Sequence, residues 1–194
     1  MSRSPFSFGT LILGGGGALL SLFLLVGWLL PQSWEAEATA HIPAAAAAVY
    51  PLLDSPEGWR RWTPWPESGI ERSGPTRGPG ATLSWDDPEL GAGSFAIVGG
   101  TEPARVDYAV RVDDGAMTTD GTLSLTPEGG GVRVDWREEG DLGWNPLMGY
   151  WALSLSRAQS EELAKGLERL RALVADAAPD APPPAPAESP SPTR

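Results

Sequence analysis

Residues 105–112 read RVDYAVRV, and this alternation indicates a β-strand with one apolar face. Val106, Tyr108, Val110 and Val112 share that face, because successive side chains of a strand point to opposite sides. Arg105 and Arg111 then lie on the solvated side. The same period of two recurs around it, in Leu83/Trp85, Phe95/Ile97, Leu123/Leu125 and Val132/Val134/Trp136. Turn signals rich in glycine and aspartate separate these segments, which predicts an antiparallel meander.

A long helix is predicted to close the domain. Asn145 is a favourable cap and Pro146 suits the first helical position. Apolar residues then repeat at helical spacing in two runs, Trp144/Met148/Trp151/Leu155 and Leu163/Leu167/Leu170/Val174. Charged residues cover the opposite face, so one apolar stripe faces the sheet.

The region before the meander predicts a strand and two short helices. Residues 35–42 alternate loosely and favour a strand. Pro43 opens an alanine-rich helix, and Ser55 begins a second short helix. The predicted domain therefore covers residues 34–176.

An apolar segment precedes this domain. Residues 10–30, after a short segment 1–9, are predicted to be a transmembrane anchor. Residues 11–30 carry no charge, and twenty residues at about 1.5 Å each cross about 30 Å of hydrocarbon. The alternative is a cleaved signal peptide. It is disfavoured because the apolar run is longer than such peptides use, and its candidate cleavage site lies in the first strand.

Charges near the two ends suggest an orientation and a tail. Arg3 precedes the apolar segment, and no Lys or Arg follows it until Arg60. The positive-inside rule then predicts a single-pass membrane protein with its N-terminus in the cytoplasm and its domain outside. Residues 177–194, rich in Pro, Ala and Ser, are predicted to be a disordered tail.

Composition excludes several classes of function. The formal net charge is −11, which argues against nucleic acid or anionic lipid as the main partner. No cysteine is present, and His41 is the only histidine. Disulfides, a cysteine nucleophile and a site with two histidine ligands are therefore excluded. We expect no metal and no cofactor.

Several stretches, taken in order, resemble the START-like (SRPBCC, Bet v 1-like) superfamily. They are HIPAAAAAVYPLLDSPEGWRRWTPW (41–65), GPGATLSWDDPELGAGSFAIVGGTEPARVDYAVRV (78–112), EGGGVRVDWREEGD (128–141), NPLMGYWA (145–152) and EELAKGLERLRALV (161–174). They look most like its polyketide cyclase/dehydrase and lipid-transport branch, which includes membrane-anchored members. One departure is Pro43, which comes earlier than the proline of the family turn.

The resemblance implies an α+β helix-grip fold, in which a curved antiparallel sheet wraps around a long C-terminal helix. It also implies an internal cavity for a hydrophobic ligand. Candidate lining residues are the large apolar side chains on the predicted inner faces, although each also suits a plain core. They are Trp62, Trp85, Phe95, Tyr108, Met117, Trp136, Met148, Trp151 and Leu155.

Three tryptophans lie close together in GWRRWTPWPE (58–67). Helical neighbours three apart share a face, so Trp59 and Trp62 are expected to point together toward one end of the sheet. Trp65 lies beyond the helix, and Arg60 and Arg61 face water. A hydrophobic plug is the favoured interpretation, and a ligand gate is the alternative.

Polar clusters offer weaker hypotheses. Glu37, Thr39 and His41 share a strand face and could hold a general base, but a solvated face explains them better. Asp86, Asp87 and Glu89 surround Pro88, as a hairpin turn would predict. The acidic runs 113–115 and 138–141 are interpreted as turns in the same way.

Three functions remain open. The first is a membrane-anchored binding or carrier domain for a hydrophobic small molecule or lipid. The second is a cyclase- or hydrolase-type enzyme acting on such a ligand in the same cavity, although no catalytic residues are identified. The third is an interaction module with a fully packed interior.

Overall fold

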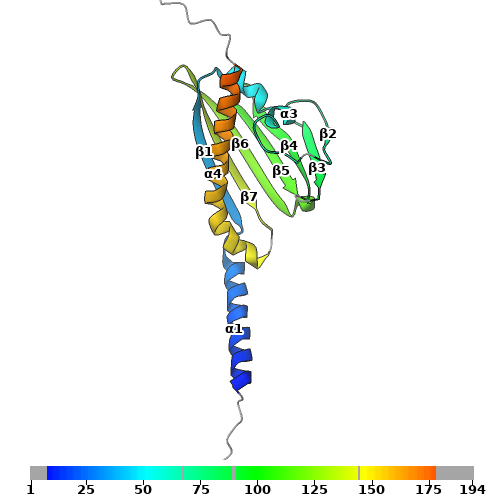
Figure 1. Cartoon of the computed structure of the whole chain (residues 1–194), viewed down its shortest axis with the longest axis vertical. Helices are drawn as coiled ribbons and strands as arrows, with labels where there is room; N and C mark the ends of the chain where they lie inside the picture. Colours follow the sequence, from blue (N-terminus) through cyan, green and yellow to red (C-terminus); the bar gives the residue numbers. More distant parts are fainter. Residues whose placement is uncertain (1–7, 67, 89–90, 144, 178–194) are drawn as a thin grey trace, which may run out of the picture.

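The computed structural model of the chain describes residues 8–66, 68–88, 91–143 and 145–177 (Figure 1). The predicted segment 1–9 and tail 177–194 therefore lie almost wholly outside the described residues. The elements run in the order α1 (Phe8–Leu29), β1 (Ser33–Ile42), α2 (Ala46–Val49), η1 (Tyr50–Leu52), α3 (Pro56–Trp59), β2 (Glu71–Ser73), β3 (Thr82–Asp87), β4 (Gly91–Thr101), β5 (Arg105–Val112), η2 (Asp113–Gly115), β6 (Met117–Glu128), β7 (Gly131–Asp141) and α4 (Pro146–Asp176).

The seven strands form one antiparallel sheet in the order β1-β7-β6-β5-β4-β3-β2. The predicted α+β class is confirmed: a curved antiparallel sheet is combined with a C-terminal helix, as in a helix-grip fold. The cap of α4 is also confirmed, since the Asn145 Oδ1 atom accepts a hydrogen bond from the Leu147 N–H at 3.0 Å.

One local prediction was wrong, and one strand was missed. The first short helix begins at Ala46 rather than Pro43. Residues 43–45 instead turn out of β1, and the Ala44 N–H donates to the Ile42 carbonyl at 2.8 Å. Strand β2 was not predicted, because its residues are all exposed and no apolar alternation marks it.

The core lies between the inner face of the sheet and α4. Alternate side chains of β5, β6 and β7 point toward the core, and α4 supplies a stripe of large buried residues. These are the predicted Leu163, Leu167, Leu170 and Val174. Helix α4 packs mainly on β1, so it covers one side of the inner face more fully than the other (Figure 1).

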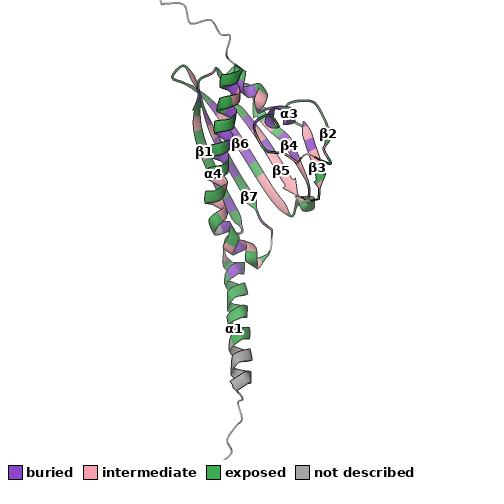
Figure 2. Cartoon of the chain, in the orientation of Figure 1, coloured by how far each residue is buried: buried purple, intermediate pink, exposed green. Residues whose placement is uncertain are grey.

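Burial changes along the strands. At the end that contacts α3, the inner-face residues Val106, Tyr108 and Leu123 are fully buried. At the other end, where α1 meets α4, the inner-face residues of β3, β5 and β6 are only half-buried (Figure 2). We call this half-buried set the inner patch; it consists of Trp85, Val110, Val112, Met117 and Thr119.

Helix α1 extends away from the domain along the long axis of the molecule (Figure 1). Its last turns contact the first turns of α4, where the Tyr150 hydroxyl donates to the Phe23 carbonyl at 2.7 Å. Among the described residues, no helix meets the combined length and apolarity expected of a membrane span.

Glycines on the inner face accommodate large rings from neighbouring strands. Gly121 of β6 lies between Tyr108 of β5 and Glu138 of β7 in the sheet register. A Cβ atom at Gly121 would overlap the Tyr108 ring. Gly93 and Gly140 make the same room for Trp85 and Trp34. Aromatic rings laid over glycine are a known means of restoring packing to a glycine-containing strand.

We therefore expect Gly121→Ala to destabilise the protein by about 1–3 kcal/mol, because the Tyr108 ring must leave its position in a packed core. Urea denaturation of purified protein measures this. Gly99→Ala is the matched control, since a Cβ there makes only ordinary contacts of 3.4 Å or more. Equal stability of the two variants would contradict this account.

Candidate ligand-binding site

The sheet register brings two polar residues together in the interior. Tyr108, Gly121 and Glu138 are direct neighbours on β5, β6 and β7. All three positions lie on the inner face, and the absence of a side chain at Gly121 lets the Tyr108 side chain reach across β6. Glu138 is only 8% exposed. A carboxyl group buried this deeply requires hydrogen-bond partners.

The partners are present. The Tyr108 hydroxyl donates to Glu138 Oε1, and Gln159 Nε2 of α4 donates to Glu138 Oε2 at 2.7 Å. Trp136 Nε1 donates to the Tyr108 oxygen at 2.8 Å. This polar network links β5 and β7, across β6, with the C-terminal helix. It lies on the inner face of the sheet, between the fully buried end of the interior and the inner patch.

The environment raises two pKa values. Burial raises the pKa of the Glu138 carboxyl, and the hydrogen bonds from Tyr108 and Gln159 offset part of that effect. Burial, and then the neighbouring Glu138 charge, raises the pKa of the Tyr108 hydroxyl well above its ordinary value. The arrangement thus favours a neutral tyrosine beside a carboxyl group that holds its proton more firmly than usual.

This raised pKa makes stability depend on pH. Because folded Glu138 binds its proton more tightly than the unfolded chain does, its contribution is fully present below about pH 4.3 and is lost as pH rises through the raised pKa. As pH rises through the raised pKa of Glu138, the wild type loses stability that Glu138→Gln does not lose. We therefore expect the unfolding free energy of Glu138→Gln to increase relative to that of the wild type over this pH range. Urea denaturation at a series of pH values measures the difference, and a constant difference from about pH 4 to pH 8 would contradict it.

An aromatic cluster fills the interior beside the network. It consists of Trp59, Trp62, Phe95, Tyr108 and Trp136, whose neighbouring ring centroids are 4.6–5.5 Å apart. The predicted orientation of Trp59 and Trp62 is confirmed, since both rings point into the interior together and Arg60 and Arg61 are exposed.

The indole N–H groups of the three tryptophans in residues 58–67 donate to acceptors nearby in the chain, within residues 52–63. Trp59 Nε1 donates to the Leu53 carbonyl at 2.5 Å, and Trp62 Nε1 donates to the Leu52 carbonyl at 3.1 Å. Trp65 Nε1 donates to Thr63 Oγ1 at 2.6 Å, and its ring packs on Phe95 and Trp85. These bonds and contacts favour the plug interpretation.

We expect Trp62→Ala to destabilise the protein by about 3–5 kcal/mol, because it removes a large ring that is 2% exposed. Thermal or urea unfolding measures the loss. Trp151→Ala provides the control, since that ring is 50% exposed and its removal leaves no comparable void. An effect of Trp62→Ala confined to ligand uptake would instead support the gate.

The nine predicted lining residues fall into three groups. Trp62, Phe95, Tyr108 and Trp136 belong to the aromatic cluster. Trp85 and Met117 belong to the inner patch. Of the three on α4, Met148 and Leu155 are half-buried against the core, whereas Trp151 is half exposed near the junction with α1. Their role as a ligand lining stays a prediction.

Glu138 and Gln159 were not predicted to belong to the site. The interpretation of residues 138–141 as a turn was wrong, because β7 continues to Asp141. A sequence signal was present, since Glu138 continues the inward parity of Val132, Val134 and Trp136. The acidic, glycine-containing composition of residues 138–141 is typical of a turn, and the interpretation followed that composition instead of the alternation.

The polar clusters considered in the sequence lie elsewhere. His41 is on the exposed face of β1, where its Nε2 lies 3.0 Å from the Glu128 carbonyl oxygen. Asp86 and Asp87 end β3, and Glu89 lies outside the described residues. Within the described part of the chain, no three histidine or carboxylate side chains gather as a metal site requires.

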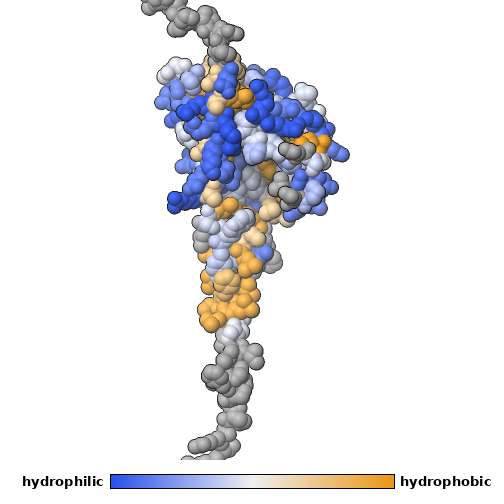
Figure 3. All heavy atoms as spheres, in the orientation of Figure 1, coloured by the Kyte–Doolittle hydropathy of each residue, from blue (hydrophilic) through white to orange (hydrophobic). Residues whose placement is uncertain are grey.

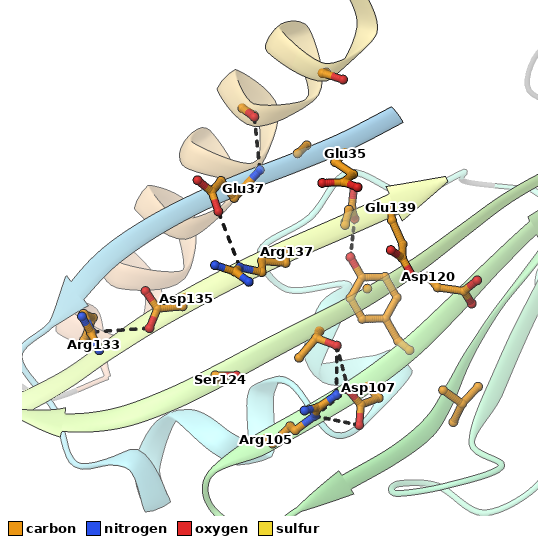
Figure 4. A pocket seen from close by; sticks show the side chains of 18 of the residues that line it. Glu35, Glu37, Arg105, Asp107, Asp120, Ser124, Arg133, Asp135, Arg137 and Glu139 are labelled. Atoms are coloured by element: carbon orange, nitrogen blue, oxygen red, sulfur yellow. Dashed lines mark hydrogen bonds and ion pairs between the residues drawn. The ribbon is translucent and has the colours of Figure 1, made fainter. Parts of the chain in front are cut away.

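A broad groove of about 1270 Å³ runs along the outer face of the sheet (Figure 4), and its lining also includes Tyr108, Gly121 and Glu138 of the polar network. Charges of both signs line it and pair with one another, as in Arg105–Asp107, Arg133–Asp135 and Arg137–Glu37. Exposed pairs of this kind are typical of a solvated sheet face. We therefore place the candidate ligand site on the inner face, at the inner patch and the polar network beside it.

Comparisons with known proteins agree with this geometry. The chain has no match among curated proteins. The similar solved structures include TTHA0849 from Thermus thermophilus (23% identical, 74% of this chain and 99% of that chain, TM-score 0.56), a Thalictrum flavum norcoclaurine synthase mutant with a transition-state analogue (13%, 75% and 96%, 0.58) and Ara h 8.0201 (15%, 74% and 99%, 0.54). At these identities the likeness concerns the fold alone.

A family model covers nearly the whole described domain. The model for polyketide cyclase / dehydrase and lipid transport matches residues 33–175, from the start of β1 to the last turns of α4. That range includes the sheet, the polar network, the inner patch and the aromatic cluster. The chain belongs to the polyketide cyclase/dehydrase and lipid-transport family.

Proposed function

We propose that this protein is a membrane-anchored binding or carrier domain for a hydrophobic small molecule or lipid. The observation that carries the proposal is the gradient of burial on the inner face. The aromatic cluster fills one end, whereas the inner patch at the other end leaves large apolar side chains half-exposed. Burying an apolar ligand there is favourable by about 0.8 kcal/mol per methylene.

The polar network gives the site one place for a polar group. Ligand sites are mostly apolar, with a few placed polar groups that orient the ligand. Thr119 lies in the inner patch, and Tyr108 and Glu138 lie in the adjacent row of the sheet. A molecule with an apolar chain and one hydrogen-bonding group suits this arrangement. In the norcoclaurine synthase mutant, the same fold accommodates a transition-state analogue.

Anchoring by α1 is part of the proposal. Apolar side chains are exposed along this helix, among them Leu19, Leu22, Leu25 and Leu29 (Figure 3). Exposed side chains of this kind suit lipid rather than water. Following the positive-inside rule, we propose a single pass with the N-terminus in the cytoplasm and the domain on the other side.

Blocking the inner patch tests the binding site. In Val110→Trp, the larger ring would occupy the space of a ligand between Phe95 and Thr119. We expect residues 31–177 of the wild type to take up a fluorescent fatty acid and the variant to bind it about tenfold more weakly or worse, a loss of about 1.4 kcal/mol. Fluorescence titration measures the affinity.

Ala109→Trp is the control, because it adds the same ring to the outer face of the same strand. Urea denaturation shows whether both variants remain folded. Equal uptake by the wild type and Val110→Trp, or no uptake by the wild type together with no lipid recovered from it, would contradict the proposal.

An enzyme is the second candidate. The observation that favours it is the Tyr108–Glu138 pair, since a buried carboxyl group with a raised pKa is suited to general acid or base chemistry. A cyclase or hydrolase would use the same inner site. Mass spectrometry of the ligand recovered after incubation with the protein separates the two functions, because a carrier returns its ligand unchanged, whereas an enzyme returns a different molecule.

A further inference from the structure

The first three turns of α4 differ in chemistry from the rest of the helix. Residues 142–156 read LGWNPLMGYWALSLS and contain no charged side chain, whereas the helix from Arg157 onward is rich in Glu, Lys and Arg. Within the uncharged turns, Leu147 is 51% exposed and Trp151 is 50% exposed. Water is an unfavourable environment for two large apolar side chains so close together.

These turns lie against the end of α1. The rings of Phe23 and Tyr150 stack with centroids 4.5 Å apart and planes inclined by 5°. Gly27 and Gly149 let the two backbones approach closely, since a Cβ atom at Gly149 would overlap the Gly27 carbonyl oxygen and one at Gly27 would overlap the Pro146 carbonyl oxygen. Close approach at small residues is typical of helix pairs in membranes.

The contact also fixes the position of the first turns of α4 along the axis of α1. Gly149 lies beside Gly27, which is two residues, or about 3 Å along the axis, before the last residue of α1. If α1 crosses the bilayer as proposed above, the first turns of α4 lie level with its outer boundary. Trp28 of α1 and Trp151 of α4 are both half-exposed in this region, and tryptophan prefers the membrane–water interface.

We infer that Pro146–Ser156 of α4 is embedded in the interfacial layer of the same lipid bilayer, with Leu147 and Trp151 facing lipid. This inference rests on the proposed anchoring by α1. The partner is the bilayer surface rather than a second copy, because the uncharged surface is continuous with α1. A neutral surface without Lys or Arg also favours insertion by burial of apolar area over attraction to anionic headgroups.

Embedding would bring the ligand site to the membrane. Met148 and Leu155 belong to the same turns and pack on the core from the α4 side. The half-buried end of the inner face, where Val112 and Met117 lie, is the end nearest α1. A lipid chain would therefore move from the bilayer to the inner patch along apolar side chains, without crossing water.

Depth-dependent quenching tests the inference on the full chain. Since the sequence has no cysteine, single cysteines at Leu25, Leu147 and Ala158 can each carry an environment-sensitive fluorophore. The protein is reconstituted in phosphatidylcholine vesicles that contain a lipid with a nitroxide near the top of the acyl chain. We expect the labels at Leu25→Cys and Leu147→Cys to lose most of their emission, and the label at Ala158→Cys to keep it.

Ala158 is the matched control because it is exposed and lies two turns beyond Trp151 on the same face of α4, about 10 Å farther along the axis. Quenching at Leu25 but not at Leu147 would overturn the inference and leave the anchor in place. Absence of quenching at all three would overturn the anchor as well. A Leu147 label that is unquenched but changes its emission when the protein is diluted in lipid would show a second copy on this face, and would also overturn the inference.

Discussion

The interior depends on one hydrogen bond, between Tyr108 and Glu138, that passes over a glycine of the intervening strand. Tyr108 reaches Glu138 only because Gly121 stands between them on β6. A shift of one residue in the β5–β6 register would turn every inner side chain of one strand toward water. The polar network can therefore form only when the strands of the meander pair in the observed register. Gln159 extends that requirement to α4, which must lie at one position along the sheet to complete the network.

Much of this architecture could be predicted from period-two and period-3.6 patterns. The alternation through Val106 and Tyr108 identified the inner face, and the Asn145–Pro146 pair located the start of α4 to the residue. Such local signals suffice because each strand has a single apolar face. Strand β2 lacked that signal, since it pairs only at the exposed edge of the sheet.

The site was harder to predict, because its content depends on contacts between distant segments. Nothing near Glu138 in the sequence shows that Tyr108, thirty residues earlier, and Gln159, on the last helix, will satisfy its carboxyl group. Nor does composition show that α4 favours β1 and leaves the inner patch half-covered. Aromatic residues on an inner face are consistent with both a core and a lining. The structure buries such residues fully at one end of the strands and leaves them half-buried at the other, and a lining role for the half-buried ones is a proposal.

The two edges of the sheet have a consequence for crowding. At the β1 edge, the Glu37 N–H donates to Ser160 Oγ of α4 at 3.2 Å, so the helix occupies part of the edge that could pair with another chain. At the other edge, β2 is only three residues long and carries Glu71 and Arg72. Short, charged or covered edges resist strand addition. If α1 anchors the protein as proposed, copies confined to two dimensions would collide often, and these edges would keep them from joining into larger sheets.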